Sequence, residues 1–162
     1  MPSPTLANHE RHLRRTFELA RQSRAHGNHP FAAILVGPDG AVLMEAENGA
    51  ESGDRTAHAE RTLMSRASLA YPTAFLGGCT LYASAEPCAM CAGAAYWTGV
   101  GRVVYGLAEK DLKALIGPHP ENLTMDLPCR TVLDAGQRTV EVIGPLLEAE
   151  ALAVHEGFWV RR

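Results

Sequence analysis

The sequence lacks most features of membrane-spanning, secreted and disulfide-stabilised proteins. No run of eighteen apolar residues occurs in its 162 residues, so we expect no membrane-spanning helix. The N-terminus, Met1-Pro2-Ser3-Pro4, lacks the apolar core of a signal peptide. Four cysteines do not make a dense disulfide framework. We therefore expect a protein of the reducing cytoplasm.

An excess of charge of either sign is also absent. The formal net charge is −3, whereas nucleic-acid-binding proteins more often carry a basic excess. Apolar residues make up 46% of the chain and charged residues 20%, which is typical of a globular protein. The length suits one domain with a real hydrophobic core.

The sequence does contain two cysteines three residues apart, Cys88 and Cys91, directly after Pro87. A proline suits the first position of a helix, which would place both thiols on one face of the first turn. A helix N-terminus lowers thiol pKa values and so favours the thiolate that binds zinc. Thirty residues upstream, His58 could supply a third ligand, with Glu60 close by. Three protein ligands leave one tetrahedral position open for a water, as in catalytic zinc sites.

Two other interpretations of the cysteine pair are a redox couple and half of a structural zinc site. A redox couple would not require His58 or Glu60. A structural site would need a fourth ligand, and neither Cys79 nor Cys129 belongs to a second close pair. The spacing therefore favours a catalytic zinc.

The segment His58-Ala59-Glu60, followed by Pro87-Cys88-Ala89-Met90-Cys91, resembles the H-x-E…P-C-x-x-C signature of zinc nucleobase deaminases. Residues 86–94 are similar to bacterial members of the cytidine and deoxycytidylate deaminase superfamily, and the resemblance extends over residues 30–106. It implies an α/β, three-layer cytidine-deaminase-like fold, with a central mixed five-stranded sheet and helices on both faces. It also implies one Zn²⁺ per chain, held by His58, Cys88 and Cys91. Glu60 would shuttle protons while a zinc-activated water displaces ammonia.

The periodicity predicts the elements of this fold. Leu6, His9, Leu13, Phe17 and Ala20 recur at helical spacing in residues 5–26. The arginines of this helix lie mostly elsewhere and suggest a solvated face, with nucleic-acid contact as the alternative. Apolar runs predict strands at 32–36, 42–46, 79–84, 100–107 and 140–143, and a closing helix at 146–158. Residues 71–78 and 110–130 are interpreted as loops, the longer one either a lid or an ordinary surface loop.

These elements divide a single zinc deaminase domain, 1–162, into four parts. We expect an N-terminal helix (1–27), a catalytic core (28–106), a loop region with the last strand (107–145), and a C-terminal helix with an aromatic tail (146–162). Asp54 or Thr56 could cap the helix that carries Glu60.

Asn48 and Phe31 lie at the mouth of the first predicted hairpin. A turn asparagine and a core aromatic are the plain alternatives for them. The resemblance implies that Asn48 hydrogen-bonds the ring edge of a base and that Phe31 lines the pocket. Ala59, between His58 and Glu60, is also assigned to the substrate site.

Three further aromatics are assigned by similarity to guanine deaminases of this fold. The segment 94–97 is similar to theirs, which implies that Trp97 packs against the substrate. Phe158 and Trp159 are similar in kind to a C-terminal segment that covers the active site of the partner subunit. The resemblance therefore implies a homodimer, with tail exchange as one arrangement.

Two glutamates complete the predicted site. Glu121 is the nearest candidate for the second acid that some of these enzymes take from the loop after a strand. Glu86 is expected to be structural, bonding backbone near the zinc loop.

We predict hydrolytic deamination of a small free nucleobase, with guanine or a guanine-like purine as the first candidate. Transfer-RNA adenosine deaminases share the cysteine motif, but they tend to have a basic C-terminal helix. Here Glu148, Glu150 and Glu156 precede a terminus with only Arg161 and Arg162. The alternatives are a tRNA adenosine deaminase, a deaminase of cytosine, a nucleoside or a triazine, and a zinc-stabilised interaction protein without chemistry.

Overall fold

A computed structural model describes residues 2–160, so Met1, Arg161 and Arg162 lie outside the described part. One five-stranded sheet runs through the molecule in the order β2-β1-β3-β4-β5. β1 is antiparallel to both β2 and β3, and β3, β4 and β5 are parallel, which confirms the predicted mixed sheet. The strands are β1 (Ala32–Val36), β2 (Val42–Glu47), β3 (Thr80–Ala85), β4 (Arg102–Leu107) and β5 (Glu141–Ile143).

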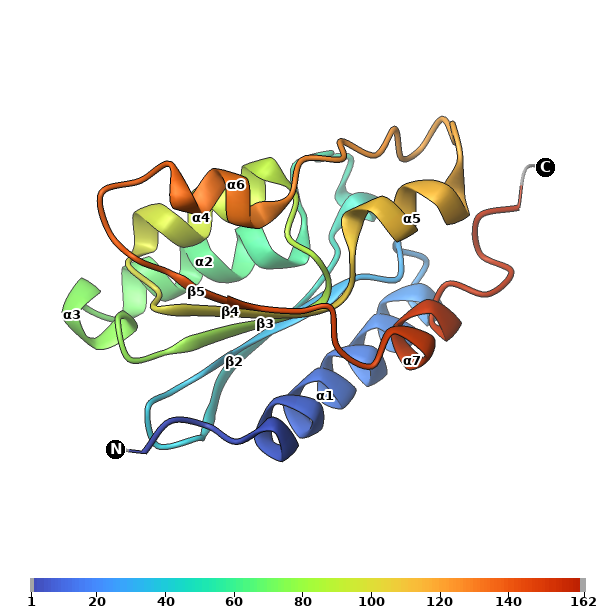
Figure 1. Cartoon of the computed structure of the whole chain (residues 1–162). Coiled ribbons are helices and arrows are strands. Elements are labelled where there is room, and N and C mark those ends of the chain that lie inside the picture. Colours follow the sequence, from blue (N-terminus) through green and yellow to red (C-terminus); the bar gives the residue numbers. More distant parts are fainter. Residues whose placement is uncertain (1, 161–162) are drawn as a thin grey trace.

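Helices cover both faces of the sheet, which confirms the three-layer prediction (Figure 1). α1 (Leu6–Ala25) and α7 (Glu148–Ala153) lie on one face. The other face carries α2 (Ala59–Ala70), α4 (Ala89–Thr98) and α6 (Cys129–Asp134), with the short α3 (Thr73–Leu76) beside them. The remaining helices, η1 (Ala50–Ser52) and α5 (Glu109–Ile116), follow β2 and β4.

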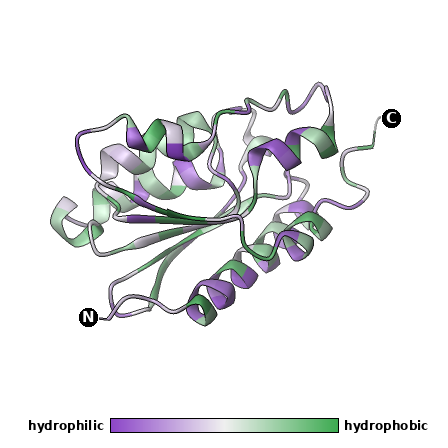
Figure 2. Ribbon diagram, viewed as in Figure 1, coloured by the Kyte–Doolittle hydropathy of each residue, from purple (hydrophilic) through white to green (hydrophobic). Residues whose placement is uncertain are grey.

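Two hydrophobic clusters hold the layers together, one on each face of the sheet. Figure 2 shows the strands as largely apolar and the outward helix surfaces as polar. On the α1 face, Phe17 packs so close to β4 that a Cβ at Gly106 would lie 2.8 Å from its ring. Only glycine fits at this crossing.

The arginines of α1 lie outside the core, as predicted. Arg14 pairs with Glu150 of α7 at 3.1 Å, and Arg15 pairs with Glu45 of β2 at 2.6 Å. Both partners neutralise charge that a nucleic-acid contact would require. This pairing favours the solvated-face interpretation.

The strand predictions are confirmed to within two residues at each end, but two loop predictions and the bounds of the closing helix were wrong. Residues 110–130 are not one loop, because α5 and α6 occupy both ends of the segment. Leu112 and Ile116 of α5 are buried at i and i+4, a helical pattern that the following glycine and prolines obscured. The closing helix is only Glu148–Ala153, and the loop at 71–78 contains α3.

The strand directions bring the functional segments together at one edge of the sheet. β2 runs parallel to β3, because both are antiparallel to β1. The carboxyl ends of β2, β3, β4 and β5 therefore meet at this edge, where β1 begins. In open α/β sheets, ligands bind at the carboxyl ends of the strands.

Candidate active site

The three predicted metal ligands lie together at this edge. His58 Nδ1 is 3.5 Å from Cys88 Sγ and 3.6 Å from Cys91 Sγ, and all three ligand atoms lie within 4.8 Å of one another. Zn–S bonds of ~2.3 Å and Zn–N bonds of ~2.0 Å in a tetrahedron require ligand atoms roughly 3.5–3.8 Å apart. The donor set and its spacing therefore fit zinc.

Helix N-termini position these ligands. His58 is the N-cap of α2 and Cys88 is the N-cap of α4, so both side chains lie beside free backbone N–H groups. The prediction that Pro87 opens the helix was wrong by two residues, since α4 begins at Ala89. Hydrogen bonds from the Cys91 thiol and the His58 ring lower the pKa of Cys88, which favours the thiolate.

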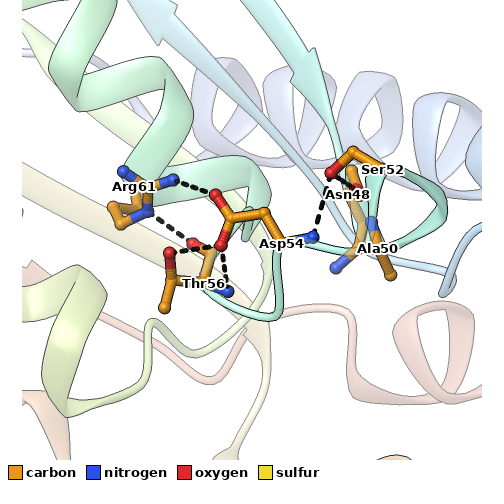
Figure 3. A network of polar contacts seen from close by, with 7 residues as sticks. Asn48, Ala50, Ser52, Asp54, Thr56 and Arg61 are labelled. Atoms are coloured by element: carbon orange, nitrogen blue, oxygen red, sulfur yellow. Dashed lines mark hydrogen bonds and ion pairs between the residues drawn. The ribbon is translucent and has the colours of Figure 1, made fainter.

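The predicted caps Asp54 and Thr56 do not cap α2, because His58 occupies that position. They instead fasten the loop before the helix (Figure 3). Asp54 Oδ1 accepts the backbone N–H of Thr56 at 2.8 Å and its hydroxyl at 2.7 Å, and Asp54 Oδ2 pairs with Arg61. This loop forms one wall of the cavity described next.

A cavity of about 530 Å³ opens beside the metal ligands and is within the size range of small-molecule sites. Its walls come from the strand ends, from the loop before α2, and from the segment after α5. The lining residues are His29, Phe31, Asn48, Ala50, Asp54, Arg55, Ala57, His58, Glu60, Ala85, Glu86, Cys88, Ala89, Met90, Glu109, Leu112 and 120–125.

Glu60 lines this cavity from the first turn of α2, as predicted. Only 5% of its surface is exposed, and burial raises its pKa to about 7. A carboxyl group with a pKa near neutrality can both take and give a proton at physiological pH.

Asn48 directly follows β2 and presents one defined face to the cavity. Its Oδ1 accepts the backbone N–H of Ala50 at 2.8 Å (Figure 3). The hydrogen-bond network thus assigns the oxygen to the protein and leaves the Nδ2 amide as a donor. Asn48 can therefore recognise an acceptor on a ligand.

The other predicted substrate residues divide into two groups. Phe31 and Glu121 line the cavity, although the Glu121 side chain is 64% exposed and lies 3.8 Å from His29 Nε2. Trp97 lies 84% exposed on α4, outside the cavity, so the prediction that it packs against the ring is not met within this chain. Ala59 is fully buried in the core of α2 and is not a lining residue.

Phe158 and Trp159 of the aromatic tail pack on their own chain, behind the cavity wall, and do not line the cavity. Trp159 contacts the rings of His29 at 5.1 Å and Phe31 at 6.1 Å, between centroids. Its Nε1–H donates to Nδ1 of the buried His155 at 3.0 Å. Within this chain, Trp159 therefore supports the cavity wall and neither Phe158 nor Trp159 lines the cavity, whereas their predicted contact with the site of a partner subunit stays a prediction.

Sequence reasoning missed Glu109, a buried carboxyl that lines the cavity just after β4. Burial, with smaller contributions from the nearby Cys88 and Glu86, raises its pKa to about 8. An acid directly after a predicted strand was the available signal, because ligands bind at such ends. Glu86, predicted to be structural, does bond backbone: its two oxygens accept the N–H groups of Glu109 at 2.9 Å and Cys129 at 2.7 Å.

Residues 6–107 match the family described as the cytidine and deoxycytidylate deaminase zinc-binding region. The chain belongs to this family of zinc-binding deaminases.

Within residues 2–160, no helix is long and apolar enough to cross a bilayer.

Three curated relatives place the chain among deaminases with different substrates. A probable cytosine deaminase of Schizosaccharomyces pombe is 38% identical over 148 residues, which cover 91% of this chain and 90% of the relative. The guanine deaminase of Bacillus subtilis is 41% identical over 106 residues, or 64% of this chain and 67% of the relative. The tRNA-specific adenosine deaminase of the same organism is 37% identical over 98 residues, or 60% of each chain.

A solved structure of a related protein in complex with 2,6-diaminopurine has the same fold. It superposes with a TM-score of 0.75 and 32% identity, covering 93% of this chain and 81% of that chain.

Proposed function

We propose that this protein is a zinc-dependent hydrolytic deaminase of a free nucleobase, with guanine or a guanine-like purine as its first substrate. The observation that carries the proposal is one cavity, beside the group of His58, Cys88 and Cys91, that is lined by the buried acid Glu60 and the amide donor of Asn48. The reaction consumes water, converts the amino-bearing ring carbon into a carbonyl and releases ammonia.

The residues of the chain account for the proton transfers of this reaction. When bound by His58, Cys88 and Cys91, zinc supplies the Lewis acidity that activates a water. Glu60 accepts the proton of that water and delivers it to a ring nitrogen. It then carries the second proton to the amine, which leaves as ammonia.

Two residues would orient the ring during the reaction. Asn48 donates from Nδ2 to an acceptor on the ring edge, and Phe31 packs against the ring at the start of β1. The cavity of about 530 Å³ has room for a bicyclic purine, which supports the purine over a single ring.

Cytosine is the second candidate substrate, because the relative that matches 90% of its own length is a probable cytosine deaminase. A tRNA substrate has less support, since the net charge is −3 and two arginines of α1 are paired with glutamates.

We propose that the protein is a homodimer, on the basis of the family resemblance. The exposed Trp97 is the kind of aromatic side chain that is found at interfaces. Sedimentation velocity of the purified protein tests the dimer.

The first experiment is ammonia release by the zinc-loaded protein, with a panel of guanine, isoguanine, adenine, cytosine, their nucleosides, ammeline and a tRNA anticodon stem-loop. We expect turnover of guanine or a related free purine. Glu60→Gln is the control, because it keeps the zinc ligands. Turnover of the stem-loop alone would reject the free-base proposal, and turnover of cytosine alone would select the second candidate.

A further inference from the structure

Glu109 is a buried acid whose carboxyl group has no bonding partner among the described residues of the protein. Only 5% of its surface is exposed, and it lines the cavity from the first turn of α5. Its backbone N–H is held by Glu86 Oε1 at 2.9 Å. Over residues 2–160, however, no protein group forms a hydrogen bond or ion pair with its carboxyl group.

The carboxyl oxygens of Glu109 are open to the cavity. Within residues 2–160, every side-chain oxygen or nitrogen that is shut off from solvent has a hydrogen-bond partner, and the Glu109 carboxyl group has none, so its oxygens are not sealed in the core. A ligand that fills the cavity would displace water from these oxygens, which costs free energy unless the ligand supplies a hydrogen bond. The position of Glu109 therefore suits a hydrogen bond with a ligand.

The sheet places Glu109 across the cavity from Asn48. Asn48 follows β2 and Glu109 follows β4, with β1 and β3 between them. Three interstrand spacings of ~4.8 Å separate these strand ends by about 14 Å. Cys88 follows β3, so the metal ligands lie between the two side chains. A ring bound at the metal centre would thus have the amide donor on one side and the Glu109 carboxyl on the other.

We propose that Glu109 is a specificity-determining residue that accepts a hydrogen bond from a ring N–H on the edge of the base opposite Asn48. This inference rests on the proposed function and deepens it. A carboxyl group can accept a hydrogen bond whether it is ionised or protonated, so the role holds in both forms. The substrate class is then an amino-substituted heterocycle with an unsubstituted ring N–H on that edge. A base substituted with a methyl or a sugar at that nitrogen loses the bond and is rejected.

The other cavity acid is less suited to this role. The Glu121 side chain is 64% exposed and can keep water as its partner. A solvated carboxylate discriminates little between ligands, whereas a desolvated one penalises a ligand that leaves it unpaired.

The test compares Glu109→Ala and Glu109→Gln with Asp111→Asn as the matched control. Asp111 lies in the same first turn of α5 but does not line the cavity. For each zinc-loaded protein, kcat and KM are measured for the preferred base and for its analogues methylated at each ring nitrogen in turn. The melting temperature and bound zinc are measured in parallel.

We expect Glu109→Ala to lower kcat/KM for the unmodified base by roughly 5–150-fold, mainly through KM, with zinc content unchanged. Glu109→Gln keeps an acceptor oxygen and should retain intermediate activity. In the wild type one N-methyl isomer should be strongly rejected, and this rejection should shrink at least tenfold in Glu109→Ala. Neither variant should lower the melting temperature, because the Glu109 carboxyl group makes no hydrogen bond or ion pair within residues 2–160 that the substitution could remove.

Unchanged discrimination against every N-methyl isomer would overturn the role of Glu109, and so would an equal loss in Asp111→Asn. A lower melting temperature with full activity would show that Glu109 is structural. If the zinc-loaded wild type deaminated no base at all, the proposed function itself would fail, and the role of Glu109 would fail with it. The two failures are therefore distinguishable.

Discussion

The Oδ1 atom of Asn48 accepts the backbone N–H of Ala50 at 2.8 Å, which leaves the amide N–H groups of Asn48 free to face a ligand. The bond spans the junction between β2 and η1, so the amide orientation is set before any ligand binds. Preorganised donors of this kind contribute to recognition without a further ordering cost.

Asn48→Asp is the sharpest test of this amide. The aspartate can keep the bond to Ala50 but presents an acceptor where a donor is needed. We expect kcat/KM to fall about 100-fold or more, with zinc content unchanged, because the ring acceptor is left unpaired or repelled. Steady-state kinetics with the preferred base measure the effect, and activity within threefold of wild type would contradict the role.

Glu60→Gln removes the proton carrier but keeps the size of the side chain. General acid–base catalysis contributes roughly 10²–10⁴-fold, so we expect kcat to fall by that factor. Metal analysis should find the same zinc content, since Glu60 is not one of the three ligands. Normal turnover by this variant would disprove the assignment.

Stability should fall as the pH is lowered, because His155 is buried in the neutral form. Burial, reinforced by the positive charge of Arg24, lowers the pKa of His155 to about 4. In the unfolded chain the value is ~6.5. The stabilisation is therefore complete above pH ~6.5 and is lost as the pH falls toward 4.

His155→Gln isolates this contribution from the other histidines. Between about pH 6.5 and 4, we expect the free energy of unfolding to fall more in the wild type than in His155→Gln. The additional loss in the wild type should be on the order of 3 kcal/mol. Urea denaturation at a series of pH values measures both proteins. Parallel pH profiles would contradict the prediction.

Glu86→Gln should destabilise the ends of the segment between α5 and α6. The carboxylate of Glu86 accepts two buried N–H groups, and the amide replaces one acceptor with a donor. Loss of a hydrogen bond to a charged group is worth ~1.5–3 kcal/mol, and we expect unfolding free energy to fall by about that amount. Glu141→Gln is the control, because its exposed pair with Arg102 should contribute about 1 kcal/mol or less. Urea denaturation and limited proteolysis of residues 117–128 measure the effect.

The parts of the site that are local in sequence could be predicted. His58, Cys88 and Cys91 each belong to a short motif, and a helix start explains their placement. Asn48 and Phe31 flank one hairpin, and the family resemblance assigned them to the substrate site. The sheet order, which brings β4 beside β3, is a long-range property of the chain. Glu109 lies near the metal ligands because β4, which it follows, is the neighbour of β3, and the sequence alone did not show this pairing.

The wrong predictions also have physical causes. Trp97 was assigned to the substrate site because the segment 94–97 is similar to that of guanine deaminases. Side chains are distributed around a helix, however, and Trp97 lies on the solvent-exposed face of α4. The helix α5 was overlooked because Gly117 and two prolines dominate the region, although the buried positions of the helix have ordinary spacing. In this chain the ring contacts of Trp159 bury it behind the cavity wall, and the predicted covering of a partner subunit's site stays a prediction.

Glu86 fastens one wall of the cavity, the segment 109–129, separately from the metal ligands. Both ends of the segment 109–129 are fastened to this one side chain, which directly precedes the Pro87-Cys88 step. Between these anchors, residues 120–125 line the cavity without contributing a zinc ligand. Substitutions between the two anchors can therefore reshape this wall of the cavity while the three candidate metal ligands stay in place.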